Sequence, residues 1–318
     1  MILDCDTGTD DAVAIMLAAL HPGIELVGCT TVNGNVEVRH CTENTLRTLD
    51  FIQRPDVPVY EGSSRPIVRL DFPLPREAQN KGRLHGTELP IPAATSRKQE
   101  TGAVEFLVET FRNATDEIAL VPVGPLTNIA AALLLDRKFV ERVPEVVIMG
   151  GAHATGNITP SAEFNVWADP EAAAIVFAAA FRKITLVPLD ATHQALVTGE
   201  QCARLDALGT PAGIAAARFI GQRIKGYDES QPMAILGSAP VHDAVCVNFL
   251  VNPSVITTKH IHVAVETRGD LTLGRTVMDV MRRGRAPPNC HVAFSADAKL
   301  FNQTMLETFA RVGGTGKE

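Results

Sequence analysis

Four aspartates stand close together near the start of the chain, in the stretch DCDTGTDD at residues 4–11. Like charges this close raise one another's pKa values unless a cation or hydrogen-bond donors compensate them. Carboxylate oxygens favour a hard ion such as Ca²⁺ or Mg²⁺ over Zn²⁺, and Gly8 permits a tight turn that points them inward. We therefore expect a metal site. The simpler alternative is that Asp10 and Asp11 favour a helix N-terminus while Asp4 and Asp6 cap a turn.

Short β-rich runs alternate with helical stretches along most of the chain, which predicts βα units and a mostly parallel central sheet with helices on both faces. We predict strands at residues 1–5, 24–32, 57–60, 118–123, 146–149 and 184–189. Helices are predicted at residues 10–20, 38–51, 102–112, 125–135, 170–180 and 213–224. The Pro-rich segment 63–92 has no clear period and predicts a long loop. Finding no linker or repeat, we expect residues 1–318 to form one α/β domain.

Polar or small residues follow several of these predicted strands. Asp4 and Asp6 end the first, residues 33–35 (NGN) follow the second, and Gly124 and residues 150–151 (GG) follow two more. Parallel sheets bind ligands beyond the carboxyl ends of their strands. We therefore expect these residues to converge on one active site.

The composition of the chain limits the kinds of partner that the protein is expected to bind and the compartment in which it is expected to work. The net charge of −7 argues against a nucleic-acid surface or an anionic membrane. The six cysteines lack CxxC spacing, which predicts that they are reduced thiols in the core. Reduced cysteines favour a cytoplasmic protein. No signal peptide or membrane-spanning run is evident in the sequence.

The acidic stretch and six later blocks, in the same order, resemble the nucleoside hydrolases. DCDTGTDD fits the DxDxGxDD motif that opens this family. The later blocks are TTVNGN at 30–35, HG at 85–86, VPVGPLTNIA at 121–130, VVIMGGA at 146–152, GNITPSAEFNVWADPEAA at 156–173 and VHDA at 241–244. The resemblance implies a Ca²⁺-dependent enzyme of purine or pyrimidine salvage that hydrolyses the N-glycosidic bond of ribonucleosides. It also implies a homodimer or homotetramer.

The resemblance also assigns roles to individual residues. The metal ligands would be Asp6, Asp11, Asp243 and the backbone carbonyl of Val123, with Asp6 also accepting a proton from the attacking water. The ribose would be bound by polar side chains and covered on its apolar side by two further residues; the polar set is Asp10, Asn35, Asn157, Glu163 and Asn165, and the apolar pair is Met149 and Phe164.

Two histidines could act on the base. His242 stands beside Asp243, and His85 lies in the long loop. Either could protonate a departing base near neutral pH, although a single histidine beside an aspartate is as often structural. The resemblance makes His242 the leaving-group acid and His85 a residue of the base pocket.

Base preference stays open in the sequence. Purine-specific relatives stack the base between tryptophans, whereas this chain has only Trp167. The two histidines are more similar to those of the inosine-uridine-preferring and pyrimidine-preferring groups. In this chain, Tyr227 and Gln231 would take the place of the residues that contact the base in broad-specificity members of the family.

Two other functions remain open at this point. DCDT also fits the DxDxT loop of haloacid-dehalogenase-type Mg²⁺ phosphatases, which would make Asp4 the nucleophile. A Ca²⁺-dependent nucleoside-binding protein without turnover is the second alternative. A product assay separates the three, since they release ribose and base, inorganic phosphate, or nothing.

Overall fold

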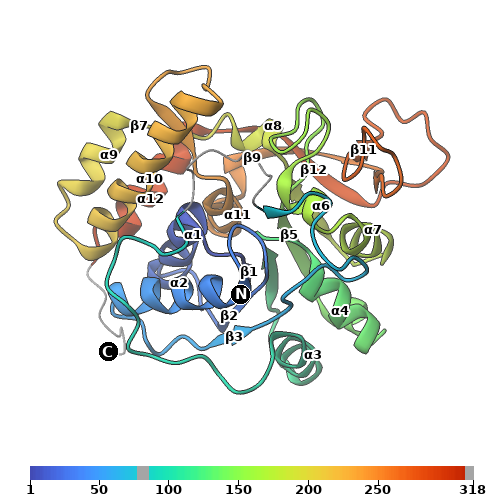
Figure 1. Cartoon of the computed structure of the whole chain (residues 1–318), viewed down its shortest axis with the longest axis horizontal. Coiled ribbons are helices and arrows are strands. Elements are labelled where there is room, and N and C mark those ends of the chain that lie inside the picture. The colour runs from blue at the N-terminus through green and yellow to red at the C-terminus, as the bar shows by residue number, and fades with distance from the viewer. Residues whose placement is uncertain (77–85, 312–318) are drawn as a thin grey trace.

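An eight-stranded sheet runs through the middle of the computed structural model, which describes residues 1–76 and 86–311 (Figure 1). Every neighbouring pair in it is parallel except the last, which joins Cys290–Ala296 to Ile256–Ile261. The mostly parallel sheet predicted from the sequence is confirmed. In spatial order the strands are β3 (Val59–Glu61), β2 (Gly28–Thr31), β1 (Ile2–Cys5), β4 (Ala119–Pro122), β5 (Glu145–Met149), β6 (Ile184–Val187), β12 (Cys290–Ala296) and β9 (Ile256–Ile261).

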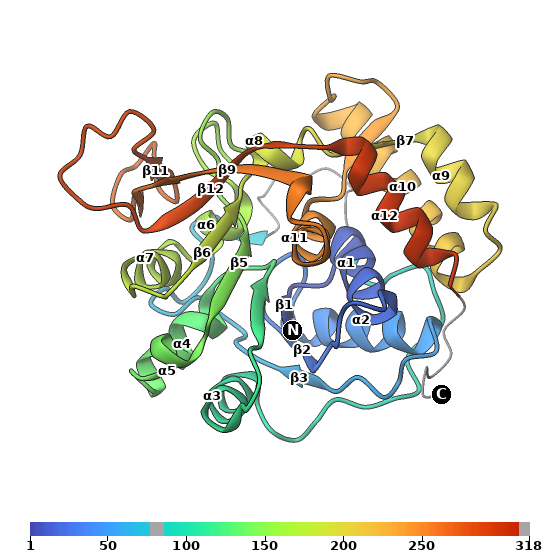
Figure 2. The same ribbon diagram turned by 180° about the vertical axis from the view of Figure 1, so that it is seen from behind.

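Helices cover both faces of the sheet, as Figures 1 and 2 show from opposite sides. One face carries α1 (Thr9–Leu20), α2 (Val38–Phe51), α9 (Gly199–Asp206), α10 (Pro211–Ser230), α11 (His242–Val251) and α12 (Ala298–Phe309). The other carries α3 (Ala103–Asn113), α4 (Thr127–Leu135), α5 (Phe139–Arg142) and α7 (Pro170–Ala178). Strand β1 divides its side chains between the two cores, Leu3 and Cys5 facing one and Ile2 the other. Burial on both faces explains why the strand lacks the regular alternation of apolar and polar residues; Asp4 is its one charged residue and is buried as well.

Smaller elements complete the fold. They are α6 (Phe164–Ala168), α8 (Leu189–Thr192) and two antiparallel pairs, β7 (Leu196–Thr198) with β8 (Ser238–Pro240) and β10 (Val263–Val265) with β11 (Thr276–Met278). Strand β8 leads directly into α11. The β10–β11 hairpin projects from one side of the molecule (Figure 1).

Most sequence predictions hold, with two corrections of length. The second strand begins at Gly28 and not at residue 24, because residues 24–27 make no ladder with a neighbour. Helix α10 continues to Ser230, six residues beyond its predicted end, and begins at Pro211 with the Thr210 side chain accepting from the Gly213 N–H. Within 63–92, the described residues contain neither an α-helix nor a strand.

Two further observations bear on the sequence predictions. All six cysteines are buried and free, as predicted for core thiols. Among residues 1–76 and 86–311, no helix is both long and apolar enough to cross a membrane.

The strand order reverses between β1 and β4, which are neighbours in space while β2 and β3 lie on one side and β5 and β6 on the other. Open α/β sheets bind ligands at such a switch point, beyond the carboxyl ends of the strands. Asp6 follows β1, and Val123 follows β4. The fold thus places these two residues side by side at the point where a ligand site is expected.

Candidate active site

The loop between β1 and α1 is folded around its own aspartates. The Asp11 carboxylate accepts hydrogen bonds from the backbone N–H groups of Asp6 (3.1 Å) and Gly8 (2.9 Å) and from the Asn35 side chain (3.2 Å). The Asp6 carboxylate accepts from the Asn35 N–H (2.6 Å). A Cβ on Gly34 would lie 2.0 Å from Asp6 Oδ2, so only glycine permits this approach. The NGN turn after β2 therefore holds Asp6 in place.

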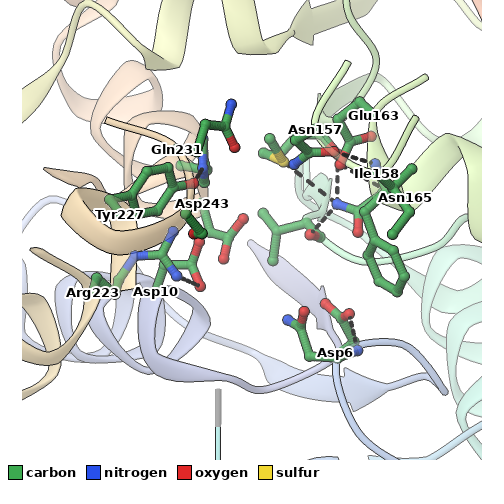
Figure 3. A pocket seen from close by; sticks show the side chains of 16 residues that line it. Asp6, Asp10, Asn157, Ile158, Glu163, Asn165, Arg223, Tyr227, Gln231 and Asp243 are labelled. Carbon is green, nitrogen blue, oxygen red and sulfur yellow. Dashed lines mark hydrogen bonds and ion pairs between the residues drawn. The ribbon is translucent and has the colours of Figure 1, made fainter. Parts of the chain in front are cut away.

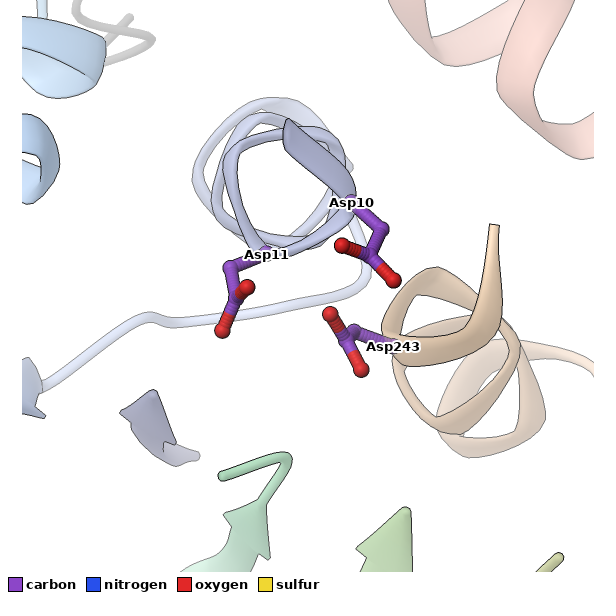
Figure 4. Close-up of side chains that lie close together, drawn as sticks. All are labelled: Asp10, Asp11 and Asp243. Carbon is purple, nitrogen blue, oxygen red and sulfur yellow. The ribbon is translucent and has the colours of Figure 1, made fainter. Parts of the chain in front are cut away.

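A third acidic side chain, Asp243, reaches the same point from the first turn of α11. Figure 4 shows Asp10 and Asp11 of α1 pointing toward Asp243, and one carboxylate oxygen of each lies within 4.8 Å of the others. Burial, and then the neighbouring aspartates, raise the pKa values of Asp11 and Asp243 well above the usual range. A bound cation would reverse this by stabilising the charged forms. The buried, oxygen-only donor set therefore fits a hard divalent ion.

The opposite wall of the cavity comes from the segment between β5 and α6, and Figure 3 shows the two walls facing each other. Glu163 caps α6 by accepting from the N–H groups of Asn165 (2.8 Å) and Val166 (3.2 Å), and it also accepts from the Gly151 N–H (2.8 Å). Asn157 accepts from the Phe164 N–H (2.9 Å). These backbone contacts fix the orientation of a wall rich in amide and carboxylate groups.

His242, the first residue of α11, has both ring nitrogens in hydrogen bonds. Its Nδ1 lies 2.7 Å from the Thr192 hydroxyl and its Nε2 lies 2.7 Å from the Tyr227 hydroxyl. Both His242 and Tyr227 line the cavity. Burial raises the pKa of Tyr227 to about 12, with nearby acidic groups adding to the rise and Arg223 opposing it. Tyr227 is therefore neutral, and its hydroxyl can pass a proton between the imidazole and a ligand.

The structure brings nearly all the predicted residues to one cavity. Its lining includes Asp6, Asp10, Asn35, Val123, Met149, Asn157, Glu163, Phe164, Asn165, His242 and Asp243. Asp11 lies just behind, in contact with Asp6 and Asn35. The Val123 carbonyl accepts a hydrogen bond from the Asn165 side chain (2.7 Å). His85 falls outside the described residues.

Three lining residues were not predicted from the sequence: Ile158, Arg223 and Ser230. The sequence pattern could have predicted the burial of Arg223, because this residue lies in the apolar stripe of α10. In that stripe Phe219, Ile220 and Tyr227 are buried at helical spacing. A charged residue in such a stripe requires a buried partner. Trp167 lies elsewhere, packed against Phe72 and Phe164 and absent from the cavity lining.

Asp4 does not belong to the cavity, although it is only two residues from Asp6. Its Oδ1 accepts from the Thr30 hydroxyl (2.5 Å) and from the Asn128 side chain (2.7 Å), and the residue is completely buried between β2 and α4. Burial raises the pKa of Asp4 to about 7, opposed by these two hydrogen bonds. This position disfavours a phosphatase in which Asp4 attacks a substrate.

The raised pKa of Asp4 makes a prediction about stability. Because the folded pKa exceeds that of an unfolded aspartate, the stability from the protonated acid is fully present below about pH 4 and is lost as the pH rises through 7. Between pH 5 and pH 7 this loss is about 2–3 kcal/mol. Asp4→Asn cannot ionise, so its free energy of unfolding should fall less than that of the wild type over this range. Denaturant titrations at both pH values, without added metal, measure the difference, and parallel pH profiles would refute it.

Fold and cavity together define an α/β enzyme with a buried carboxylate cluster and a polar pocket at the switch point of its sheet. The sequence model of the family described as inosine-uridine preferring nucleoside hydrolase matches residues 1–303. The pyrimidine-specific ribonucleoside hydrolase RihB of Escherichia coli (strain SE11) is 38% identical over 302 residues, which cover 95% of this chain and 94% of the relative.

Solved structures agree with this likeness. A purine-preferring ribonucleoside hydrolase from Gardnerella vaginalis has a TM-score of 0.87 at 32% identity and covers 97% of each chain. The plant nucleoside hydrolase PpNRh1 has a TM-score of 0.84 at 29% identity, covering 97% of this chain and 98% of its own. The chain therefore belongs to the nucleoside hydrolase family and is a nucleoside N-ribohydrolase, as its sequence motifs indicated. This family is metal-dependent in general.

Proposed function

We propose that this enzyme is a Ca²⁺-dependent hydrolase of ribonucleosides with Asp6 as the base and His242 as the leaving-group acid. The observation that carries the proposal is the convergence of three buried carboxylates, Asp10, Asp11 and Asp243, beside a polar pocket. Asp6, Asp11, Asp243 and the Val123 carbonyl would hold the ion. When bound, Ca²⁺ lowers the pKa of a water molecule and binds substrate oxygens.

The ribose would lie between the two walls of the cavity. Asp10 and Asn35 offer polar groups from one side, and the other side offers Asn157, Glu163 and Asn165, with Met149 and Phe164 against the apolar side of the sugar. These groups can bind a flattened, positively charged ribosyl group more tightly than the ground state. Such differential binding raises the rate of bond cleavage.

The chemical step needs two proton transfers. Asp6 accepts a proton from the attacking water as the new C–O bond forms at the anomeric carbon. As the C–N bond breaks, the departing base takes a proton from His242 by way of the Tyr227 hydroxyl, the partner of its Nε2. The products are ribose and the free base, and the two protons balance.

The base would lie near the end of α10, where Tyr227, Ser230 and Gln231 line the cavity. Ile158 lines the opposite wall (Figure 3). No tryptophan contributes to the described lining. Without aromatic stacking, contact area favours a purine little over a pyrimidine. We propose that uridine and cytidine are cleaved at least comparably to inosine, in line with the pyrimidine specificity of RihB.

The broader setting is also a proposal. The six buried, free cysteines favour work in the cytoplasm. The reaction suits nucleoside salvage, with small ribonucleosides and neither nucleic acid nor membrane as partners. We propose a single domain that assembles as a homodimer or homotetramer.

A product assay tests the function directly. Purified enzyme with uridine, cytidine or inosine and Ca²⁺ is expected to release equal amounts of ribose and base. Chelation should stop the reaction, and added Ca²⁺ should restore it. Release of phosphate from phosphate esters would favour the phosphatase, and nucleoside binding without release of ribose would favour a binding protein. Full turnover by enzyme shown to be metal-free would contradict the role of Ca²⁺.

A further inference from the structure

A buried arginine reaches into the acidic cluster from α10. Arg223 is 1% exposed, and its guanidinium lies 2.8 Å from Asp10 Oδ1. Its Nε donates to the Pro240 carbonyl (3.0 Å), at the end of β8. The guanidinium also lies over the Tyr227 ring, 5.5 Å from its centre. One side chain therefore joins α10, the first turn of α1 and the strand that leads to His242 and Asp243. Figure 3 shows its pairing with Asp10.

The positively charged Arg223 does not pair equally with the carboxylates of the acidic cluster. Of the three carboxylates that could hold an ion, Asp10 is paired with Arg223. Asp11 accepts from neutral donors, namely N–H groups and an amide. Among the described residues, no ion pair joins a cation to Asp11 or Asp243. Burial lowers the pKa of Arg223, but Asp10 and the other nearby acidic groups raise it by more, so this residue stays charged.

We propose that Arg223 is a positioning residue that keeps Asp10 out of the ligand set of the metal and holds it ready to accept a ribose hydroxyl. The inference rests on the proposed function, because it concerns the metal and the ribose of that site. Asp10 Oδ1 is occupied by the guanidinium, and the paired charge attracts a cation less than that of Asp11 or Asp243. The remaining oxygen of Asp10 is left for the substrate. Arg223 therefore lowers the affinity of the site for the metal and fixes Asp10 as an acceptor for a ribose hydroxyl.

The test compares three variants of the full-length protein. Arg223→Met removes the charge and keeps much of the volume, whereas Arg223→Lys keeps the charge. Arg218→Met is the matched control, since Arg218 is an exposed arginine on the same helix and outside the cavity. Calorimetric titration with Ca²⁺ measures affinity without any need for turnover. Kinetics with uridine give kcat and KM.

Arg223→Met is expected to bind Ca²⁺ at least about fivefold more tightly than the wild type, because a nearby positive charge is lost and a carboxylate is released to the ion. Its kcat/KM for uridine should nevertheless fall about 100-fold, because Asp10 is no longer held for the substrate. Arg223→Lys should stay within about tenfold of the wild type in kcat/KM, and Arg218→Met within about twofold in both measurements. General damage to the fold would weaken both Ca²⁺ binding and turnover. Tighter Ca²⁺ binding together with a lower kcat/KM therefore distinguishes the proposed role from such damage.

Unchanged or weaker Ca²⁺ binding in Arg223→Met would overturn the proposal, as would an absence of Ca²⁺ binding in every protein. If Arg223→Met does not fold, Arg223→Gln replaces it with the same expected signs. A wild type that binds Ca²⁺ but releases no ribose would refute the proposed function. The Ca²⁺ titrations would still decide whether Arg223 restrains Asp10.

Discussion

Asp6→Asn is expected to lower kcat by about 10³-fold or more, roughly 4 kcal/mol of transition-state stabilisation. Asparagine has nearly the same shape as aspartate and keeps an oxygen that can accept from the Asn35 N–H, so the loop after β1 should keep its conformation. The amide cannot take a proton from water. The loss should therefore appear in kcat more than in KM. The measurement is steady-state kinetics on uridine with saturating Ca²⁺.

Asp4→Asn provides the matched control, because Asp4 lies two residues away and is also fully buried, yet outside the cavity. Its kcat should remain within about threefold of the wild type. The same variant tests the phosphatase alternative, which would require Asp4 as the nucleophile. If Asp6→Asn kept kcat within about tenfold, or 1.4 kcal/mol, Asp6 would not be the base. A large loss in Asp4→Asn would point to the buried acid instead.

The site was easier to predict from the sequence than the outer parts of the fold. Asp6, Asp10 and Asp11 lie in one short motif, and the topology of a parallel sheet dictates that residues after β1 and β4 meet. The motif and one topological rule therefore predicted that these parts of the chain converge, while the family resemblance supplied the roles proposed for the individual residues.

Elements late in the chain were missed for physical reasons. Helix α11 (HDAVCVNFLV) is buried through Asn248 and shows no polar stripe, so periodicity cannot distinguish it from a strand. Strand β9, at the edge of the sheet, has only its first and last residues buried and lacks the alternation of a half-buried strand. Its position depends on pairing with β12, about 30 residues later, which no local pattern encodes.

The partners of predicted residues were also beyond the reach of the sequence. His242 was identified beside Asp243, but its contacts with Thr192 and Tyr227 join residues 50 and 15 positions away. The pairing of Arg223 with Asp10 spans 213 positions. The sequence thus predicted the candidate reacting groups, whereas their supporting contacts required the tertiary structure.

Those supporting contacts shape the second large prediction, which concerns the leaving group. His242→Ala is expected to lower kcat/KM for uridine about 10²–10³-fold, because the base must be protonated as the C–N bond breaks. Tyr227→Phe removes only the hydroxyl beside Nε2, and it should cause a loss of similar kind if the proton passes through that hydroxyl. Both variants should retain Ca²⁺ affinity, which calorimetry measures independently.

A substrate that needs no proton distinguishes an acid from a structural histidine. The leaving group of 4-nitrophenyl riboside departs as an anion, so His242→Ala should reduce its cleavage by less than about fivefold. Equal losses on uridine and on the activated riboside would mean that His242 orients its neighbour Asp243 or the ribose. The two variants together show which residue protonates the leaving base. If Tyr227→Phe slows cleavage of uridine alone while His242→Ala slows cleavage of both substrates, the tyrosine is the proton donor and the histidine supports it. Selective loss on uridine in both variants would identify the hydrogen-bonded pair as the acid.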